Sequence, residues 1–484
     1  MLSSLRSRSV FYASLIVLSA AVLVSGQAPP KKDIPGPAKK ADQAPEKDRG
    51  QILAEIAVAR EAFGKDPDKA ESRFRLSQLL YQAGNFEESL VVLRPLLEAQ
   101  RTPVNALLLA ADLDYLFGRY ESAEDILQRI VAGNPPDKAA QLKAQVKLMF
   151  VCYQTNRFEK AAGLFQGTEG KIKLPLLDLM RAFGRDKPFR ADWADKSRRT
   201  VIPFIVKDPL PVIAVEVHGR QIYALIDTGA DMFVLDSEIA ASMGIKGLAS
   251  TTGTFAGGKQ AEVGFAELDS LKIGDVTLTS VPISLLPTQR FSKGFAIGKY
   301  TVGGIVGTGI LKQFLSTLDY PNSRLILRRP DSRGIEELGR EMAGKTTVEV
   351  PFVLALSHFM IARGRLNDTE PLTFFVDSGL ASEAALTAPV QTLKYAGIPV
   401  PETKIQEGSI GGGGGAGFGT GLFAIRRLGL GPLVQVDKKG EFGSFPPGGY
   451  WMLGFIDDGI ISHQFLREYA WTIEFSSMKM IFAK

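Results

Sequence analysis

The chain has 484 residues, which is too long for one ordinary domain and predicts about three folded units. Its hydrophobic content of 45% and charged content of 23% are typical of a globular protein and exclude a disordered or fibrous one. The formal net charge of +5 is small for this length, so we expect it to serve solubility and not nucleic-acid binding.

Residues 1–26 have the pattern of a secretory signal peptide. Two arginines precede an apolar run over residues 10–24, and small residues follow it. An uncleaved N-terminal anchor is the alternative, because the run approaches the length that spans a membrane. Residues 27–49 are rich in Pro, Lys and Ala, which predicts a disordered linker.

Cys152 is the only cysteine, so an intrachain disulfide is excluded. It lies in an apolar helical pattern, where its expected role is to fill the core. Export without disulfides favours a periplasmic or secreted protein of a bacterial envelope, membrane-anchored only if the N-terminal segment stays uncleaved.

Residues 50–166 have helical periodicity and an internal repeat. Gly84-Asn85-Phe86 recurs as Gly118-Arg119-Tyr120, which places the two aromatic residues 34 positions apart. A looser third copy, Asn156-Arg157-Phe158, has Asn in place of Gly. This period and pattern resemble the tetratricopeptide repeat.

The tetratricopeptide resemblance implies an all-α solenoid that binds a protein or peptide partner. The alternative is that the helices act as a packing spacer or a dimer surface. Residues 167–200 follow as a connector. We expect its polar and basic second half to be solvated, after a capping helix near residues 174–183.

From Val201 onward the sequence predicts an all-β structure, because short apolar runs alternate with Gly and Pro turns. His218-Gly219-Arg220 is expected to be a hairpin turn between two strands. The same alternation of short apolar runs and turns repeats in the second half, so we divide this part into residues 201–335 and residues 336–484.

Each half contains an Asp directly after an apolar strand. The first is Asp227-Thr228-Gly229, and the second is Asp377-Ser378-Gly379. A carboxylate at the end of a buried strand is costly unless a neighbouring group hydrogen-bonds it. Thr228 and Ser378 can supply hydroxyl groups, and a glycine allows close approach.

A second element follows each Asp at a similar distance. Ile305-Val306-Gly307 follows Asp227, and Met452-Leu453-Gly454 follows Asp377 as its expected counterpart. The two halves therefore read as an internal duplication that contributes one motif Asp each.

These motifs resemble those of the aspartic peptidases, specifically the retropepsin-like group. The segment 225–231 is similar to a retroviral protease's active-site segment, and Ile305-Val306-Gly307 to that family's later apolar element. The resemblance covers residues 201–484 and implies a bilobal acid-protease fold, with both lobes in one chain as in pepsin-like enzymes. Leu380 departs from the pattern, since the family usually has a small or hydroxyl residue there.

The resemblance implies an aspartic endopeptidase in which the Asp227/Asp377 pair activates a water molecule. Thr228, Gly229, Ser378 and Gly379 would support the two carboxylates. No metal or cofactor is expected. The three histidines and one cysteine form no zinc-binding motif.

Two other readings stay open. The lobes can have kept the protease fold as a peptide- or protein-binding scaffold with little activity. Alternatively, two chains can share one site, with the other lobe structural.

Family members close a hairpin flap over the substrate, and each lobe offers a candidate segment. In the first lobe the candidate residues are Thr254, Phe255 and Gly257. In the second they are Gly412 and Gly413, within a five-glycine run. So many glycines predict a mobile lid, with a plain surface loop as the alternative.

Overall fold

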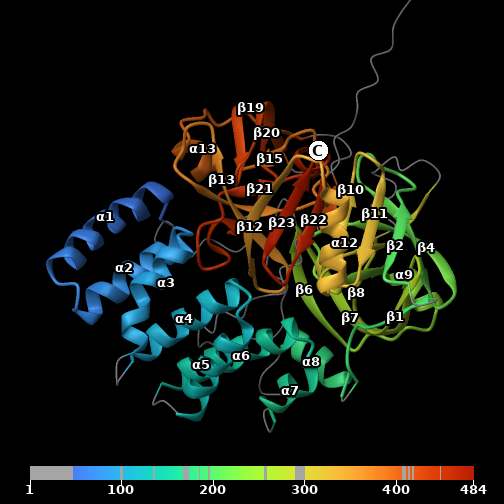
Figure 1. Cartoon of the computed structure of the whole chain (residues 1–484), viewed down its shortest axis with the longest axis horizontal. Coiled ribbons are helices and arrows are strands. Elements are labelled where there is room, and N and C mark those ends of the chain that lie inside the picture. The colour runs from blue at the N-terminus through green and yellow to red at the C-terminus, as the bar shows by residue number, and fades with distance from the viewer. Residues whose placement is uncertain are drawn as a thin grey trace, which may run out of the picture.

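The structure is a computed structural model. It describes residues 47–98, 102–133, 137–166, 174–184, 186–194, 197–255, 259–288, 300–405, 410–411, 415–416, 419–446 and 448–484. A helical part comes first and is followed by two β lobes, which we call lobe 1 (201–335) and lobe 2 (336–484) (Figure 1). This confirms the predicted order of an all-α part before an all-β bilobal part.

The helical part is built from antiparallel helix pairs. Its helices are α1 (Arg49–Lys65), α2 (Ala70–Gln82), α3 (Phe86–Leu97), α4 (Val104–Leu116), α5 (Tyr120–Ala132), α6 (Lys138–Gln154), α7 (Phe158–Gly163) and α8 (Pro175–Ala182). Among the described residues, none of the helices has the length and apolar character needed to cross a membrane.

The repeated sequence motif marks the turn inside each helix pair. Gly84, Gly118 and Asn156 have φ angles of 77°, 71° and 56°, the left-handed region that glycine adopts freely. Asn tolerates this region better than other side chains, so the third copy keeps the turn without a glycine. Cys152 is buried in α6 among apolar residues, as the helical pattern predicted.

Lobe 1 is a closed barrel with strands in the order β8-β5-β9-β4-β3-β7, closed by pairing of β7 with β8. The strands are β3 (Val212–Val217), β4 (Arg220–Ile226), β5 (Phe233–Asp236), β7 (Lys259–Ile273), β8 (Val276–Leu286) and β9 (Val302–Val306), with β6 (Ala249–Phe255) added on β7. The helices of lobe 1 are α9 (Ser237–Ser242) and α11 (Thr308–Leu311), and α12 (Ser332–Met342) crosses the boundary to lobe 2. The expected hairpin turn at His218 joins β3 to β4.

Lobe 2 repeats this barrel in the order β20-β15-β21-β14-β13-β19, closed by pairing of β19 with β20. The strands are β13 (Phe359–Leu366), β14 (Leu372–Val376), β15 (Leu386–Thr387), β19 (Gly419–Leu430), β20 (Leu433–Phe442) and β21 (Gly459–Ile461). The shorter elements are α13 (Val390–Tyr395), β16 (Lys404–Ile405), β17 (Ile410–Gly411), β18 (Gly415–Ala416), η4 (Gly449–Trp451) and α14 (His463–Leu466).

A continuous antiparallel sheet joins the two lobes in the order β12-β23-β22-β10-β11-β2. Its strands are β2 (Arg199–Pro203), β10 (Leu315–Asp319), β11 (Arg324–Arg328), β12 (Thr347–Ala355), β22 (Ala470–Glu474) and β23 (Lys479–Ala483). At its centre, where β10 of lobe 1 meets β22 of lobe 2, the hydroxyls of Thr317 and Thr472 lie 2.7 Å apart. The lobes therefore share backbone hydrogen bonds as well as side-chain packing.

The duplication is real, but one expected counterpart was wrong. The strand that pairs in parallel with β4 is β9, which contains Ile305 and Val306. In lobe 2 the strand that pairs in parallel with β14 is β21, so the counterpart is Ile460-Ile461-Ser462. Met452-Leu453-Gly454 instead lies in the loop after η4, where Gly454 is near Tyr81 of α2.

The segment expected to be a solvated connector contains regular structure. The described residues include the expected helix (α8) and also β1 (Arg190–Trp193), which pairs antiparallel with β8. The buried indole of Trp193 packs edge to face on Phe314, so the second half of this segment belongs to lobe 1.

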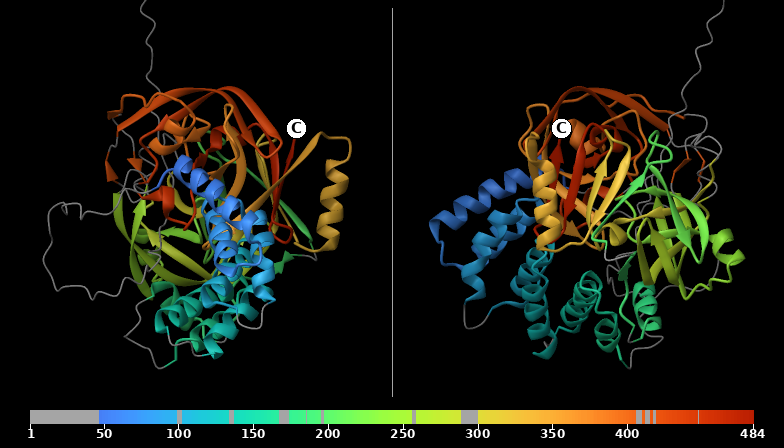
Figure 2. Two further views of the ribbon diagram at one scale, coloured as in Figure 1. Left: turned by 90° about the vertical axis from the view of Figure 1, so that its left-hand side faces the viewer. Right: turned by 45° about the vertical axis from the view of Figure 1, so that its right-hand side comes forward.

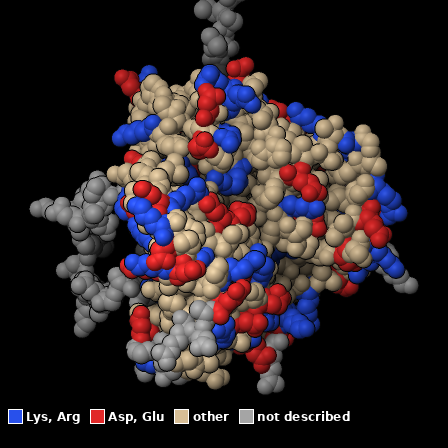
Figure 3. Space-filling model, turned by 60° about the vertical axis from the view of Figure 1, so that its left-hand side comes forward, with Lys and Arg blue, Asp and Glu red and all other residues tan. Residues whose placement is uncertain are grey.

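The helical part lies along both lobes and not apart from them. Helix α1 contacts α13 of lobe 2, and α8 contacts β6 and β7 of lobe 1. Figure 2 shows the helices between these ends running as one arc beside the β lobes. On the face that includes this arc, acidic and basic side chains are interspersed, in keeping with the small net charge (Figure 3).

Candidate active site

Asp227 and Asp377 lie at equivalent ends of their barrels. Asp227 follows β4, and its N–H donates to the carbonyl of Val306 at 3.1 Å. Asp377 follows β14, and its N–H donates to the carbonyl of Ile461 at 2.9 Å. Both residues are almost fully buried, with exposures of 1% and 0%.

Each of the two carboxylates lies against the glycine of the opposite lobe. Each Asp Oδ1 accepts a 2.7 Å hydrogen bond from the glycine two positions on, Gly229 or Gly379. A Cβ at Gly229 would lie 2.6 Å from Oδ2 of Asp377, and one at Gly379 would overlap the carboxylate of Asp227. Because each glycine sits against the opposite carboxylate, a side chain at either position would push the pair apart.

Thr228 and Ser378 join the two loops beneath the carboxylates. The Thr228 N–H donates to Ser378 Oγ at 3.0 Å, and the Ser378 N–H donates to Thr228 Oγ1 at 2.9 Å. The Thr228 hydroxyl donates in turn to the carbonyl of Val376 at 2.9 Å. The structure thus brings together the two Asp, the two hydroxyl residues and the two glycines singled out from sequence.

Two further residues lie close to the loop of lobe 1, and sequence reasoning missed both. The Thr308 hydroxyl donates to the carbonyl of Thr228 at 2.9 Å. His358 of lobe 2 is buried, and burial lowers its pKa to about 3 against a smaller opposing effect of the Gly229 backbone, so its imidazole is neutral. Only Thr308 had a signal in the sequence, since it directly follows Ile305-Val306-Gly307.

Asp231, at the end of the lobe 1 loop, contacts the helical part. The Tyr153 hydroxyl of α6 donates to its Oδ1 at 2.9 Å. Burial raises the pKa of Asp231 to about 6, while hydrogen bonds from Tyr153 and Ser357 and the charge of Lys312 act in the opposite direction. The helical part therefore reaches within four positions of Asp227.

The neighbours of Leu380 explain why a large apolar residue stands at this position of the motif. It is buried in a hydrophobic cluster shared between lobe 2 and the helical part. The cluster includes Phe375 and Phe455 of lobe 2, and Phe86 and Leu113 of helices α3 and α4. A large apolar residue after Gly379 suits a lobe whose surface is covered by helices.

The predicted flap residues lie at the edge of the described structure. Thr254 and Phe255 are in β6, where they pair with Gln260 and Lys259 of β7. Gly257, Gly412 and Gly413 lie outside the described residues. Within the ranges that the structure covers, no group of His, Cys, Asp and Glu is arranged to hold a metal ion.

Comparison with known proteins gives one family match and several partial similarities to solved structures. A family model described as aspartyl protease matches residues 213–311, and no curated protein matches the chain. Similar solved structures include a retropepsin-like aspartic protease from Rickettsia conorii (17% identity, 29% of this chain and 94% of that one, TM-score 0.20). Another similar structure is basic 7S globulin from soybean, with 10% identity over 61% of this chain and 95% of that one and a TM-score of 0.32. A third is MamA, with 19% identity over 28% of this chain and 79% of that one and a TM-score of 0.25.

The family match covers the loop of Asp227 and the β4–β9 pairing that holds it. Lobe 2 repeats the same strand order around Asp377. The β part of this chain therefore has two barrels arranged as in a bilobal aspartic protease fold, and the first barrel matches the aspartyl protease family model.

Proposed function

We propose that the protein is an aspartic endopeptidase that hydrolyses peptide bonds at the Asp227/Asp377 pair. The observation that carries the proposal is the mutual arrangement of the two loops. Each glycine lies against the opposite carboxylate, and Thr228 and Ser378 hydrogen-bond across the lobes.

The chemistry follows from two carboxyl groups sharing a buried site. Two adjacent carboxylates cannot both ionise easily, so the pair holds one proton, as it does in aspartic proteases generally. The ionised member takes a proton from a water molecule as its oxygen attacks the peptide carbonyl carbon. The protonated member hydrogen-bonds the carbonyl oxygen, and the proton taken from water passes to the departing nitrogen as the C–N bond breaks.

A catalytically weak scaffold that binds peptides or proteins is the second candidate. The nearly complete burial of both Asp side chains favours it, because a substrate must reach them. Helices α3 and α4 pack against lobe 2. This favours packing on the lobes as the role of the helical part over recruitment of a partner. We also propose export to the cell envelope or beyond, on the basis of the N-terminal sequence alone.

The test is cleavage of a peptide library by the full chain between acid and neutral pH. Asp227→Asn and Asp377→Asn should each abolish cleavage. Asp269→Asn is the matched control, since this lobe 1 carboxylate is 91% exposed, and it should leave cleavage unchanged. Loss of activity in only one of the two variants would indicate a site shared between chains, and an inert parent at every pH would favour the scaffold.

A further inference from the structure

The turns of all three helix pairs lie against the β lobes. A Cβ at Gly84 would overlap Thr373 of lobe 2, and one at Gly118 would overlap Met478. The third turn has Asn156 in place of glycine, and Asn156 Nδ2 donates to Oε1 of Gln313 in lobe 1 at 3.2 Å. The sequence repeat therefore marks a row of contacts with the protease fold.

The last turn of α6 makes the most direct connection to the active site. Gln154 Nε2 donates to the carbonyls of Leu356 and Ser357 of lobe 2, each at 3.0 Å. Its Oε1 accepts from Lys312 Nζ of lobe 1 at 2.6 Å. Together with the bond from Tyr153 to Asp231, one helical turn is hydrogen-bonded to both lobes.

Asp231 is tied to the catalytic loop by the backbone as well. The Ala230 N–H donates to the carbonyl of Asp227 at 3.2 Å, and the carbonyl of Ala230 accepts from Thr308 at 2.8 Å. A displacement of Asp231 is therefore transmitted to Asp227 through a short, hydrogen-bonded segment.

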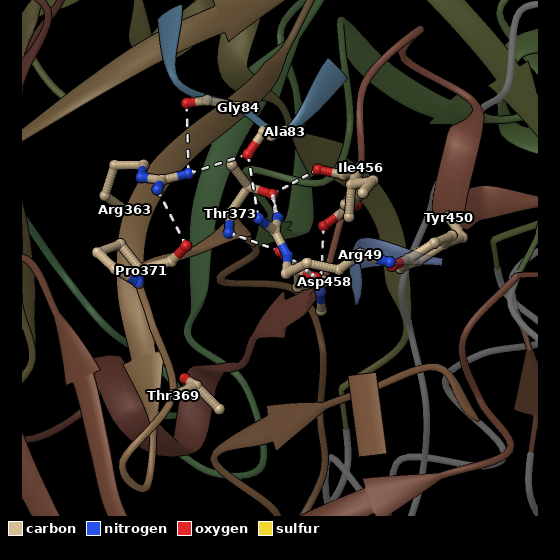
Figure 4. A network of polar contacts seen from close by, with 12 residues as sticks. Arg49, Ala83, Gly84, Arg363, Thr369, Pro371, Thr373, Tyr450, Ile456 and Asp458 are labelled. Carbon is tan, nitrogen blue, oxygen red and sulfur yellow. Dashed lines mark hydrogen bonds and ion pairs between the residues drawn. The ribbon is translucent and has the colours of Figure 1, made fainter. Parts of the chain in front are cut away.

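A second connection holds the helical part on the catalytic strand of lobe 2. Arg49 of α1 pairs with Asp458 and donates to the carbonyl of Ala83 at 3.1 Å (Figure 4). Asp458 Oδ2 accepts at 2.9 Å from the N–H of Thr373, which lies on β14 four positions before Asp377. The helices are thus bonded close to both Asp residues.

We propose that Tyr153 is a positioning residue for the peptidase reaction, because its hydroxyl fixes Asp231 and with it the loop that carries Asp227. Tyr153 touches neither carboxylate of the pair, and it acts through Asp231. The catalytic part of this inference depends on the proposed function, whereas the fixing of the loop does not.

The groups that face Asp231 set the expected pH behaviour. They are Tyr153 and Tyr115 from the helical part, Lys312 from lobe 1, and Ser357 from lobe 2 with the neutral His358 beside it. The ionised carboxylate accepts the Tyr153 hydroxyl. Removing that hydroxyl raises the pKa of Asp231, so Asp231 becomes protonated at a higher pH.

The experiment compares Tyr153→Phe with the parent in the full chain. Tyr120→Phe is the matched control, because its hydroxyl is buried in the same helical part and has no hydrogen-bond partner among the described residues. In Tyr153→Phe we expect kcat to fall about tenfold with KM changed less than about twofold. We also expect the acid limb of the kcat profile to move to higher pH, and Tyr120→Phe to match the parent.

Amide hydrogen exchange provides a readout that needs no activity. We expect faster exchange across residues 228–233 in Tyr153→Phe than in the parent or in Tyr120→Phe. An inert parent with this exchange difference would refute the peptidase function but support the fixing of the loop. Unchanged exchange, or an unchanged kcat and pH profile in an active enzyme, would overturn the proposal.

Discussion

Arg49 and Asp458 are 409 positions apart in the chain and form an ion pair in which both side chains are buried (Figure 4). Arg49 Nε donates to Oδ1 of Asp458 at 2.9 Å. The pair lies between the first helix and the loop before β21, so it holds the helical part on lobe 2. Buried pairs of this kind are costly to break, because removing one partner leaves the other charge without compensation.

Arg49→Met should therefore destabilise the protein strongly. We expect the free energy of unfolding to fall by about 3–5 kcal/mol. Urea titration of the full chain measures this change. Arg60→Met is the control, since the pair of Arg60 with Glu88 is exposed and should contribute less than about 1 kcal/mol. Equal effects of the two substitutions would show that the Arg49 pair is not buried as described.

Gly229→Ala should abolish most of the proposed activity. The added methyl group would lie 2.6 Å from Oδ2 of Asp377 and displace that carboxylate. We expect kcat/KM for peptide cleavage to fall by about a hundredfold or more. Gly64→Ala is the control, because nothing lies within 4 Å of that position in α1, and it should leave the activity unchanged. An active Gly229→Ala variant would contradict the close approach of the two loops.

Thr228→Val should weaken the junction between the lobes. It removes the hydroxyl that accepts from the Ser378 N–H and donates to the carbonyl of Val376, and it leaves both groups buried. We expect the free energy of unfolding to fall by about 2 kcal/mol. Thr228→Ser keeps the hydroxyl and should recover most of the loss. Calorimetry of the three proteins measures the effect, and a Ser variant as unstable as the Val variant would assign the effect to the methyl group instead.

Glu441 should make stability depend on pH. Burial raises its pKa to about 8, so the folded protein favours the neutral carboxyl group. Its contribution to stability is fully present below the pKa of the unfolded chain and is lost as the pH rises through about 8. We expect the melting temperature to fall less between pH 5 and pH 9 in Glu441→Gln than in the parent. Melting temperatures that change equally with pH in the two proteins would contradict this assignment.

The local signals of the two Asp motifs were strong enough to predict which residues come together at the lobe boundary. Asp227-Thr228-Gly229 and Asp377-Ser378-Gly379 each place a carboxylate, a hydroxyl and a small residue in one turn after an apolar strand. The third element was harder. Met452-Leu453-Gly454 and Ile460-Ile461-Ser462 are both apolar pairs followed by a small residue, and only pairing with β14 distinguishes them. That pairing is a long-range contact without a local pattern.

The helical repeats also combine features that the sequence predicted with contacts that only the fold revealed. Their period predicted paired helices, and the turn positions of Gly84, Gly118 and Asn156 follow from the backbone that each residue type can adopt. Which surface those turns meet depends on side chains hundreds of positions away. The bonds from Tyr153 to Asp231 and from Asn156 to Gln313 therefore emerged only from the fold.

The sequence by itself determined the all-α part, the two all-β halves and the residue types of the Asp227/Asp377 pair, because each is a property of neighbouring residues. The tertiary structure decided that the two loops face each other, that Leu380 lies against helices and that the helical part is bonded to both lobes. These facts depend on packing and hydrogen bonds between distant segments, whose partners are fixed only when the chain folds.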